Sequence, residues 1–371
     1  MKMSTYLDYN ATAPMRAEAL AAFVQASEVA GNPASVHGSG RNSRAILETA
    51  RRVLAESVGC KTAELIFTSG GTEADNLALL GTSSSRILTS AIEHDAVLAA
   101  SPNAVRLPVS RDGVVDLEHL QRELAKSDDK PLVSILWVNN ETGVIQPIGE
   151  IARLVHDAGG LLHVDAVQGF TKLPNVELLG ADLISLSAHK IGGPVGVGAL
   201  VVREGIALQA RNLGGGQELG RRSGTQNVAG AVAFAKAAEV ADAARKAETE
   251  RLSGLRTQLE EAILGTAPEA IISGKEAKRV ANTSNIILPG VPAETQVMSL
   301  DLAGFAVSAG SACSSGKVTK SHVLDAMYGD DGLSGSGIRV SLGYRTTAEE
   351  VSAFVAAWSS MRDRLSPAAK G

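Results

Sequence analysis

The sequence predicts an α/β fold in which helices cover a mostly parallel sheet. Apolar runs typical of strands alternate with helical patterns through most of the chain, and this alternation implies a mostly parallel sheet. The 371 residues suffice for a large core and for two domains. Hydrophobic residues make up 44% of the chain and charged residues 20%, as is ordinary for a globular protein.

The elements follow from local patterns. A helix is predicted over residues 43–59, where apolar residues recur at helical spacing up to a glycine, and further helices over 72–80 and 148–158. The predicted strands of the sheet are short apolar runs at residues 64–69, 86–89, 132–138, 161–165, 183–186 and 199–202. In such folds, ligands gather outside the carboxyl ends of the strands.

A long helix is predicted over residues 228–264, because this stretch lacks proline and is dominated by Ala, Glu, Arg and Leu. We expect the domain boundary near the end of this helix. Shorter strands follow near residues 285–288, 305–307 and 338–342, with helices between and after them.

Composition argues against several classes of protein and site. The 35 basic and 40 acidic residues give a net charge of −5, so nothing indicates binding to nucleic acid or to an acidic membrane. Two cysteines, Cys60 and Cys313, cannot form a disulfide framework and argue against a zinc site, and the histidines lack metal-ligand spacing. We therefore expect no metal and a reducing, cytoplasmic location. No apolar run reaches membrane-spanning length.

The segment 183–194 is the candidate centre of the chemistry. An apolar run leads directly into Ser187, His189 and Lys190. A lysine at the mouth of an apolar strand suits a Schiff base, because desolvation lowers the pKa of the amine toward its reactive neutral form. The alternative is a strand that surfaces at a solvated lysine, and this segment alone does not decide between the two.

Two other predicted strands end in polar segments. Gly71 and Thr72 lie in a glycine-rich turn before a helix, which suits an anion such as phosphate, although on that segment alone an ordinary turn with a Thr72 cap is favoured. Asp165 could hold a protonated ring nitrogen, with Gln168 on the following turn, or it could simply cap a helix.

Asn140 and His94 follow two further strands at the same edge of the sheet. A lone histidine is usually structural, so His94 gains weight only from its neighbours. Together, a phosphate-binding turn, an aspartate, amides, an imidazole and a lysine at the ends of parallel strands are the groups that bind pyridoxal phosphate. The combination favours that cofactor over a purely structural interpretation.

Two residues of the C-terminal part are candidates for chemistry on a substrate. Cys313 lies among small residues at 308–316, which is typical of a pliable, exposed loop with a nucleophilic thiol, or of a small buried residue in a tight turn. Arg339 lies in the alternating stretch 338–342, where it could clamp a carboxylate or form a surface ion pair.

These segments, in this order, resemble the cysteine desulfurases of the class V aminotransferase fold. The matching segments run nearly end to end and lie at residues 6–14, 31–37, 69–76, 93–94, 139–141, 165–168, 187–190, 221–225, 311–313 and 338–339. The resemblance implies a fold type I pyridoxal-phosphate enzyme with a seven-stranded sheet. It also implies a large cofactor domain of residues 15–264 and a small α+β domain of residues 1–14 and 265–371.

The resemblance implies a role for each matched residue. Lys190 would bind the cofactor covalently and move protons, Asp165 would keep the ring nitrogen protonated, and His94 would stack on the ring. Residues implied to hold the ring hydroxyl and the phosphate are Asn140, Gln168, Gly71, Thr72, Ser187, His189 and, from a second subunit, Thr225. Arg339 would bind the substrate carboxylate, with Asn32 nearby.

The implied reaction converts L-cysteine to L-alanine and leaves the sulfur on Cys313 as a persulfide. The implied enzyme is a homodimer with a shared active site, and it supplies sulfur to an acceptor or iron–sulfur scaffold protein. The alternatives are a selenocysteine lyase, another class V carbon–sulfur lyase or transaminase, and a non-catalytic sulfur carrier. The loop around Cys313 disfavours a transaminase, and the joint presence of Lys190, Asp165, His94 and Cys313 argues against a carrier.

Overall fold

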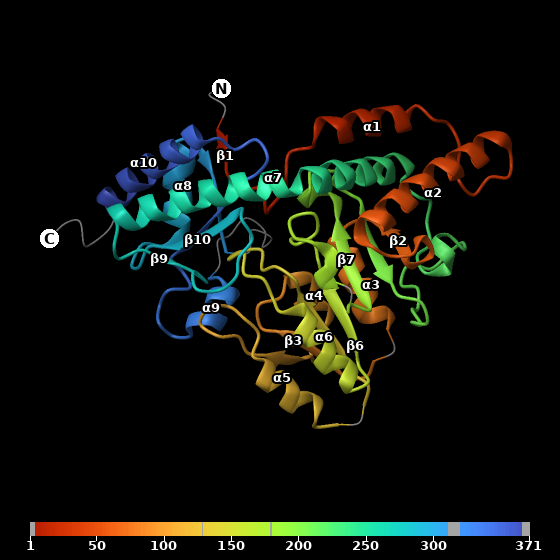
Figure 1. Ribbon diagram of the computed structural model, residues 1–371, viewed down its shortest axis with the longest axis horizontal. Helices are drawn as coiled ribbons and strands as arrows, with labels where there is room; N and C mark the ends of the chain where they lie inside the picture. Colours follow the sequence, from red (N-terminus) through yellow and green to blue (C-terminus); the bar gives the residue numbers. More distant parts are fainter. Residues whose placement is uncertain (1–3, 83, 128, 179, 311–319, 366–371) are drawn as a thin grey trace.

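The computed structural model describes residues 4–82, 84–127, 129–178, 180–310 and 320–365. A seven-stranded sheet has the order β2-β8-β7-β6-β5-β3-β4. Its strands are β2 (Leu65–Thr68), β3 (Ile87–Ser90), β4 (Val105–Leu107), β5 (Leu132–Leu136), β6 (Leu161–Asp165), β7 (Leu183–Ser187) and β8 (Gly198–Val202). Figure 1 shows the labelled strands of this sheet below α7 (Val228–Thr266), in the right half of the molecule. All pairings in this sheet are parallel except those of β8. The mostly parallel, seven-stranded sheet is thus confirmed.

Helices cover both faces of this sheet, because its strands are apolar on both sides. One face packs against α2 (Gly38–Val58), α5 (Leu117–Leu124), α6 (Ile148–Asp157) and the first half of α7 (Val228–Thr266). The other face packs against α3 (Gly71–Gly81) and α4 (Asp95–Ala100). The helix α1 (Ala17–Ser27) packs on α7. Among the described helices, none combines the length and the hydrophobicity needed to cross a bilayer.

A smaller, antiparallel sheet has the order β12-β13-β10-β9. Its strands are β9 (Ile271–Ile272), β10 (Thr283–Ile287), β12 (Ser308–Ala309) and β13 (Gly337–Ser341). The helices α8 (Ala293–Leu302) and α10 (Ala348–Leu365) pack on it, together with the second half of α7 (Figure 1). The long helix α7 therefore belongs to both cores, and the division of the chain at residue 264 stays a prediction.

The boundaries differ from the predicted ones where the decisive contact is not local. The predicted strand at 305–307 corresponds to β11 (Phe305–Ala306), which pairs with β1 (Thr5–Tyr6). A separate short strand, β12, follows at residue 308 and pairs with β13. Helix α2 begins five residues before the predicted start at 43, because His37 Nδ1 caps it by accepting from Gly40 N at 3.3 Å. Histidine is not one of the residues that usually cap a helix N-terminus, so the residue types alone did not predict a start at Gly38.

The N-terminal segment 8–14 lies between the two sheets. Asp8 bridges to Ser341 of β13, and Ala13 N donates to His189 O, after β7. The Tyr9 ring packs directly on the backbone of Gly343, where an added Cβ would lie 1.9 Å from a ring carbon. A side chain at residue 343 would thus displace Tyr9, and with it the segment that connects the two sheets.

We predict that Gly343→Ala lowers the free energy of unfolding by about 3 kcal/mol, because the site has no room for a methyl group. Gly254→Ala is the control, since a Cβ at this exposed position of α7 meets nothing within 4 Å. Alanine there should raise stability by about 0.5–1 kcal/mol through its helix propensity. Urea unfolding of the two variants measures both effects, and equal midpoints would contradict the proposed role of Gly343.

Candidate active site

The carboxyl ends of the parallel strands bring the predicted residues together. Strand β6 ends at Asp165, and β7 ends at Ser187 and continues into the short 3₁₀ helix η3 (Ala188–Lys190). These strands are neighbours in register, with Asp165 opposite Ser185. Strand β2 leads into α3, which begins at Gly71. This edge of the sheet is therefore the candidate active site.

Ser187 and the first turn of α3 form a cradle for an anion. The Ser187 hydroxyl is buried and has no hydrogen-bond partner among the described residues. A Cβ on Gly71 would lie 3.6 Å from Ser187 Cβ and only 2.8 Å from Val167 Cγ2, so the helix start approaches the strand closely. The first N–H groups of a helix lack partners within that helix and favour negative charge. This arrangement, with Thr72 exposed on the same turn, fits a phosphate group.

Asp165 is the buried carboxyl of the site. Its Oδ1 accepts a hydrogen bond from Val167 N at 2.9 Å. Burial raises the pKa of Asp165, although this hydrogen bond and the nearby charges of His94 and Lys190 oppose the rise. A nearby cation stabilises the charged form of a buried carboxyl. A protonated ring nitrogen would be such a cation.

His94 and Lys190 have defined contacts around Asp165. His94 caps α4, and its Nδ1 accepts from Ala96 N at 3.1 Å, so this ring nitrogen carries no proton. The Lys190 amine donates to the carbonyl oxygens of Asn10 at 2.7 Å and Ala11 at 2.8 Å. Lys190 is therefore held between the large sheet and the N-terminal segment.

Arg339 lies on β13 at the opposite wall of the site. It pairs with Asp8 through Nη2 at 2.7 Å and donates to the Asn140 carbonyl through Nη1 at 3.1 Å. Its Nε is buried without a hydrogen-bond partner among the described residues. The loop that carries Asn140 is fixed by buried Asn139, whose Oδ1 accepts from the backbone N–H groups of Glu141 and Thr142. Arg339 is thus a rigidly held cation whose Nε keeps an unused hydrogen-bond donor.

Three predicted site residues, His189, Thr225 and Asn32, are not shown by the single chain to serve their predicted roles. His189 Nδ1 is hydrogen-bonded with Thr12 Oγ1 at 2.6 Å, and burial lowers its pKa to about 4. Thr225 is exposed beside a small hollow that it lines with Ser69. Asn32 is exposed on the loop between α1 and α2. Figure 1 shows this loop at the opposite end of the molecule from the small sheet. Their roles remain predictions, as does that of Cys313, which lies outside the described residues.

Sequence reasoning missed a buried polar layer behind Asp165. His163 is hydrogen-bonded with Ser134 at 2.8 Å and Ser185 at 2.9 Å, and burial lowers its pKa to about 3. Burial also raises the pKa of Asp75 well above its usual range, and the charge of Asp165 raises it further. The serine hydroxyls on neighbouring strands could not be recognised as partners before the strand register was known.

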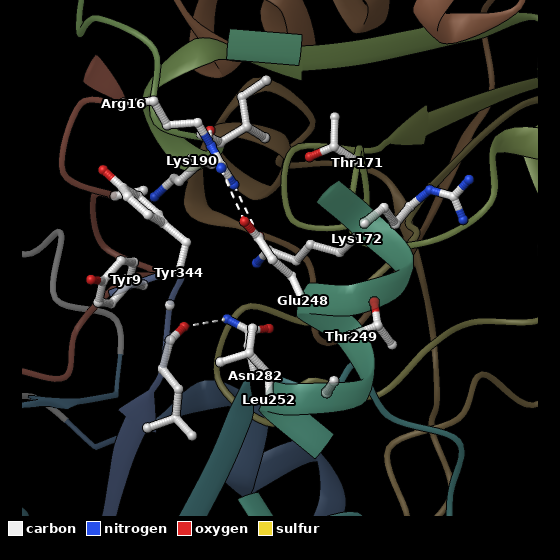
Figure 2. Close-up of a pocket in the computed structure, with 16 residues that line it drawn as sticks. Tyr9, Arg16, Thr171, Lys172, Lys190, Glu248, Thr249, Leu252, Asn282 and Tyr344 are labelled. Atoms are coloured by element: carbon white, nitrogen blue, oxygen red, sulfur yellow. Dashed lines mark hydrogen bonds and ion pairs between the residues drawn. The ribbon is translucent and has the colours of Figure 1, made fainter. Parts of the chain in front are cut away.

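A cavity of about 70 Å³ lies beside Lys190, between the N-terminal segment, α7 and the small sheet. Figure 2 shows the side chains of Lys172 and Lys190 reaching into it from different elements. Arg16 and Glu248 are paired across it at 3.0 Å. Sequence reasoning also missed Lys172, because a single lysine four residues after Gln168 carries no recognisable pattern.

We predict a stability change with pH that depends on Glu93, the buried neighbour of His94. Burial raises the pKa of Glu93 to about 8, so between about pH 4.5 and 8 the folded protein keeps a proton that the unfolded chain has lost. Relative to Glu93→Gln, the wild type should lose about 1.4 kcal/mol of stability per pH unit over this range, and no more above pH 8. Urea unfolding at several pH values tests this, and parallel curves would contradict it.

The comparisons with known proteins agree with this geometry. Residues 5–354 match the family described as aminotransferase class-V. A cysteine desulfurase IscS of Dictyoglomus turgidum is 40% identical over 368 residues, which cover 95% of this chain and 92% of that one. A cysteine desulfurase of Cereibacter sphaeroides is 43% identical over 363 residues, covering 93% and 92%. The structure of a NifS-like protein from Rickettsia africae matches with a TM-score of 0.91 at 34% identity, covering 97% and 99%.

Proposed function

The chain belongs to the aminotransferase class-V family, and we propose that it acts as a pyridoxal-phosphate-dependent cysteine desulfurase. The substrate is L-cysteine and the organic product is L-alanine. The observation that carries the proposal is the grouping of Lys190, Asp165 and the unpartnered Ser187 hydroxyl at one edge of the sheet, beside the start of α3.

Each part of the cofactor has matching residues in this chain. When bound, pyridoxal phosphate supplies an electron-withdrawing ring that weakens bonds next to the substrate amino group. Ser187 and the N–H groups at Gly71 and Thr72 hold the phosphate, and the Asp165 carboxylate holds the proton on the ring nitrogen. The groups that bind the ring and its substituents are His94, Asn140, Gln168, His189 and Lys190.

Arg339 orients the substrate. Its guanidinium is fixed by Asp8 and the Asn140 carbonyl, so the buried Nε edge is the part that can bind the carboxylate of cysteine. The Lys190 amine, held by the carbonyls of Asn10 and Ala11, then takes and returns the proton of the substrate α-carbon. A fixed arginine sets the substrate's orientation before any bond breaks.

Cys313 accepts the sulfur. Its thiolate attacks the sulfur of the bound cysteine, an S–S bond forms, the Cβ–S bond breaks, and the remaining carbon takes up a proton to give alanine. The other thiol does not suit this role, since burial raises the pKa of Cys60 to about 11 and disfavours its thiolate. The persulfide sulfur then passes to an acceptor, such as an iron–sulfur scaffold protein of the cytoplasm.

We predict that Lys190→Ala loses the visible absorbance of the bound cofactor and at least about 10³-fold of the activity, because the covalent attachment and the proton carrier are both removed. Cys313→Ala should keep the absorbance but release neither alanine nor sulfide from L-cysteine in the presence of a thiol reductant. Cys60→Ala is the matched control and should behave as the wild type. Full activity in Cys313→Ala would indicate instead a lyase that expels sulfur directly.

The active enzyme is a homodimer with a shared site. Large apolar side chains are exposed on one face, where residues 33–34 and 216–219 line one hollow, and Gly196, Val197 and Thr225 line its neighbour. The exposed side chains are Val36 at 85%, Val195 at 71%, Leu213 at 84% and Leu219 at 70%. Such a face is typical of an interface between subunits. Asn32 and Thr225 lie in the same region, so each can complete the site of the second subunit.

The double variant Leu213→Glu/Leu219→Glu tests the dimer. Two charges on the proposed interface should convert the dimer to a monomer in sedimentation velocity, and should weaken cofactor retention because Thr225 is lost from the second subunit's site. The control is Met298→Glu/Leu302→Glu on α8, which changes two exposed apolar residues elsewhere. A wild-type protein that sediments as a monomer would overturn the shared site.

A further inference from the structure

Asn10 connects the two sheets through a complete set of hydrogen bonds. It is only 2% exposed. Its N–H donates to Ser341 Oγ at 3.0 Å, and its side-chain amide donates to Asn140 O at 3.1 Å and Thr283 Oγ1 at 2.9 Å. Its two oxygens accept from Lys190 at 2.7 Å, Gln168 at 2.9 Å, Lys172 at 3.2 Å and Asn282 at 3.0 Å. Because each donor and acceptor of Asn10 has a partner, its side chain is held in one orientation.

Lys172 is an unassigned amine in this network. It donates to Asn10 Oδ1 at 3.2 Å and to Gln168 Oε1 at 2.9 Å. Burial, together with the charges of Lys190 and Arg339, lowers the pKa of Lys172 to about 7. Burying an amine beside other cations destabilises the folded state, so its retention here calls for a function.

The backbone that presents Lys172 is strained. The preceding residue, Thr171, has a φ of 62°, which is rare for a β-branched residue. Strain of this kind persists where the surrounding structure requires it, and it is concentrated at functional sites. The turn from Gln168 to Lys172 is therefore fixed in a conformation that directs both side chains to Asn10.

We propose that Asn10 and Lys172 form a positioning pair for Lys190 and Gln168, a proposal that rests on the proposed role of Lys190 as the cofactor lysine. Lys172 fixes the Gln168 amide with Oε1 toward itself and Nε2 toward the Asn10 carbonyl. It also fixes the Asn10 side chain through Oδ1, and the main-chain carbonyl of the same residue accepts from the Lys190 amine.

The pair also affects the protonation of Lys190. A cation at Lys172 disfavours a second positive charge on the Lys190 nitrogen. The titratable and charged groups beside Lys172 come from the two hollows that it lines and from its charged neighbours; they are Tyr9, Arg16, Lys190, Arg245, Lys246, Glu248, Glu250, Glu261, Arg339 and Tyr344. Asp165 and His189 face Lys190 itself. Glu248 is paired with Arg16 and not with Lys172. Lys172 and Lys190 both donate to Asn10, so Lys172 is placed to act on Lys190.

The test is a pH titration of the visible absorbance of the cofactor-loaded enzyme, which responds to protonation at the Lys190 nitrogen. Lys172→Met should raise the midpoint by about 0.5–1 pH unit, because a nearby positive charge is removed. Lys172→Arg keeps the cation and the donors, so its midpoint should lie at or below that of the wild type. Arg245→Met is the matched control: Arg245 lines the same cavity but pairs with Asp242, so the midpoint should not move.

The outcomes separate the two proposals. A midpoint in Lys172→Met within about 0.2 pH unit of the wild type, or an equal rise in Lys172→Arg, overturns the positioning pair. Absence of the visible band in the loaded wild type, or its persistence in Lys190→Ala, overturns the proposed function instead. If Lys172→Met does not fold, Lys172→Gln replaces it, because glutamine also removes the charge.

Discussion

The site depends on the passage of the N-terminal segment between the two sheets. Asn10 joins Lys190 and Gln168, which follow strands of the large sheet, to Ser341 and Thr283 of the small one. Two residues earlier in the chain, Asp8 holds Arg339. The segment therefore helps to fix the separation between the residues proposed to bind the cofactor and Arg339, which is proposed to bind the substrate. Hydrogen bonds in a buried site are directional, so the segment sets both distance and orientation.

The sequence predicted the large sheet well, because a parallel strand buried on both faces is a continuous apolar run. Asp165, Ser187 and Lys190 were predictable for the same reason, since each follows such a run directly. Lys172 was not, because its partner Asn10 is 162 residues away and only the folded chain brings them together. Strand β4, Val105–Leu107, was missed because three residues with a central arginine give too weak a pattern.

The buried polar residues behind Asp165 lower the stability of the folded chain. Burial shifts the pKa values of Glu93, Asp75 and His163 so that their neutral forms are favoured. Burying each of these polar groups lowers the stability of the folded state. The apolar helices on both faces of the sheet offset this cost through burial. A purely structural core would hold apolar residues at these positions. Glu93 follows β3, His163 lies within β6 and Asp75 lies on α3 beside His163, so this polar layer lies next to the candidate site.

The length of α7 limits how the two hydrophobic cores can move relative to each other. Its 39 residues span roughly 58 Å at the usual rise and contribute to both hydrophobic cores. A hinge between the two cores would have to break hydrogen bonds inside this helix. The cores therefore cannot open as separate bodies around α7, and loss of one removes packing from the other. Such a chain should unfold in a single cooperative transition.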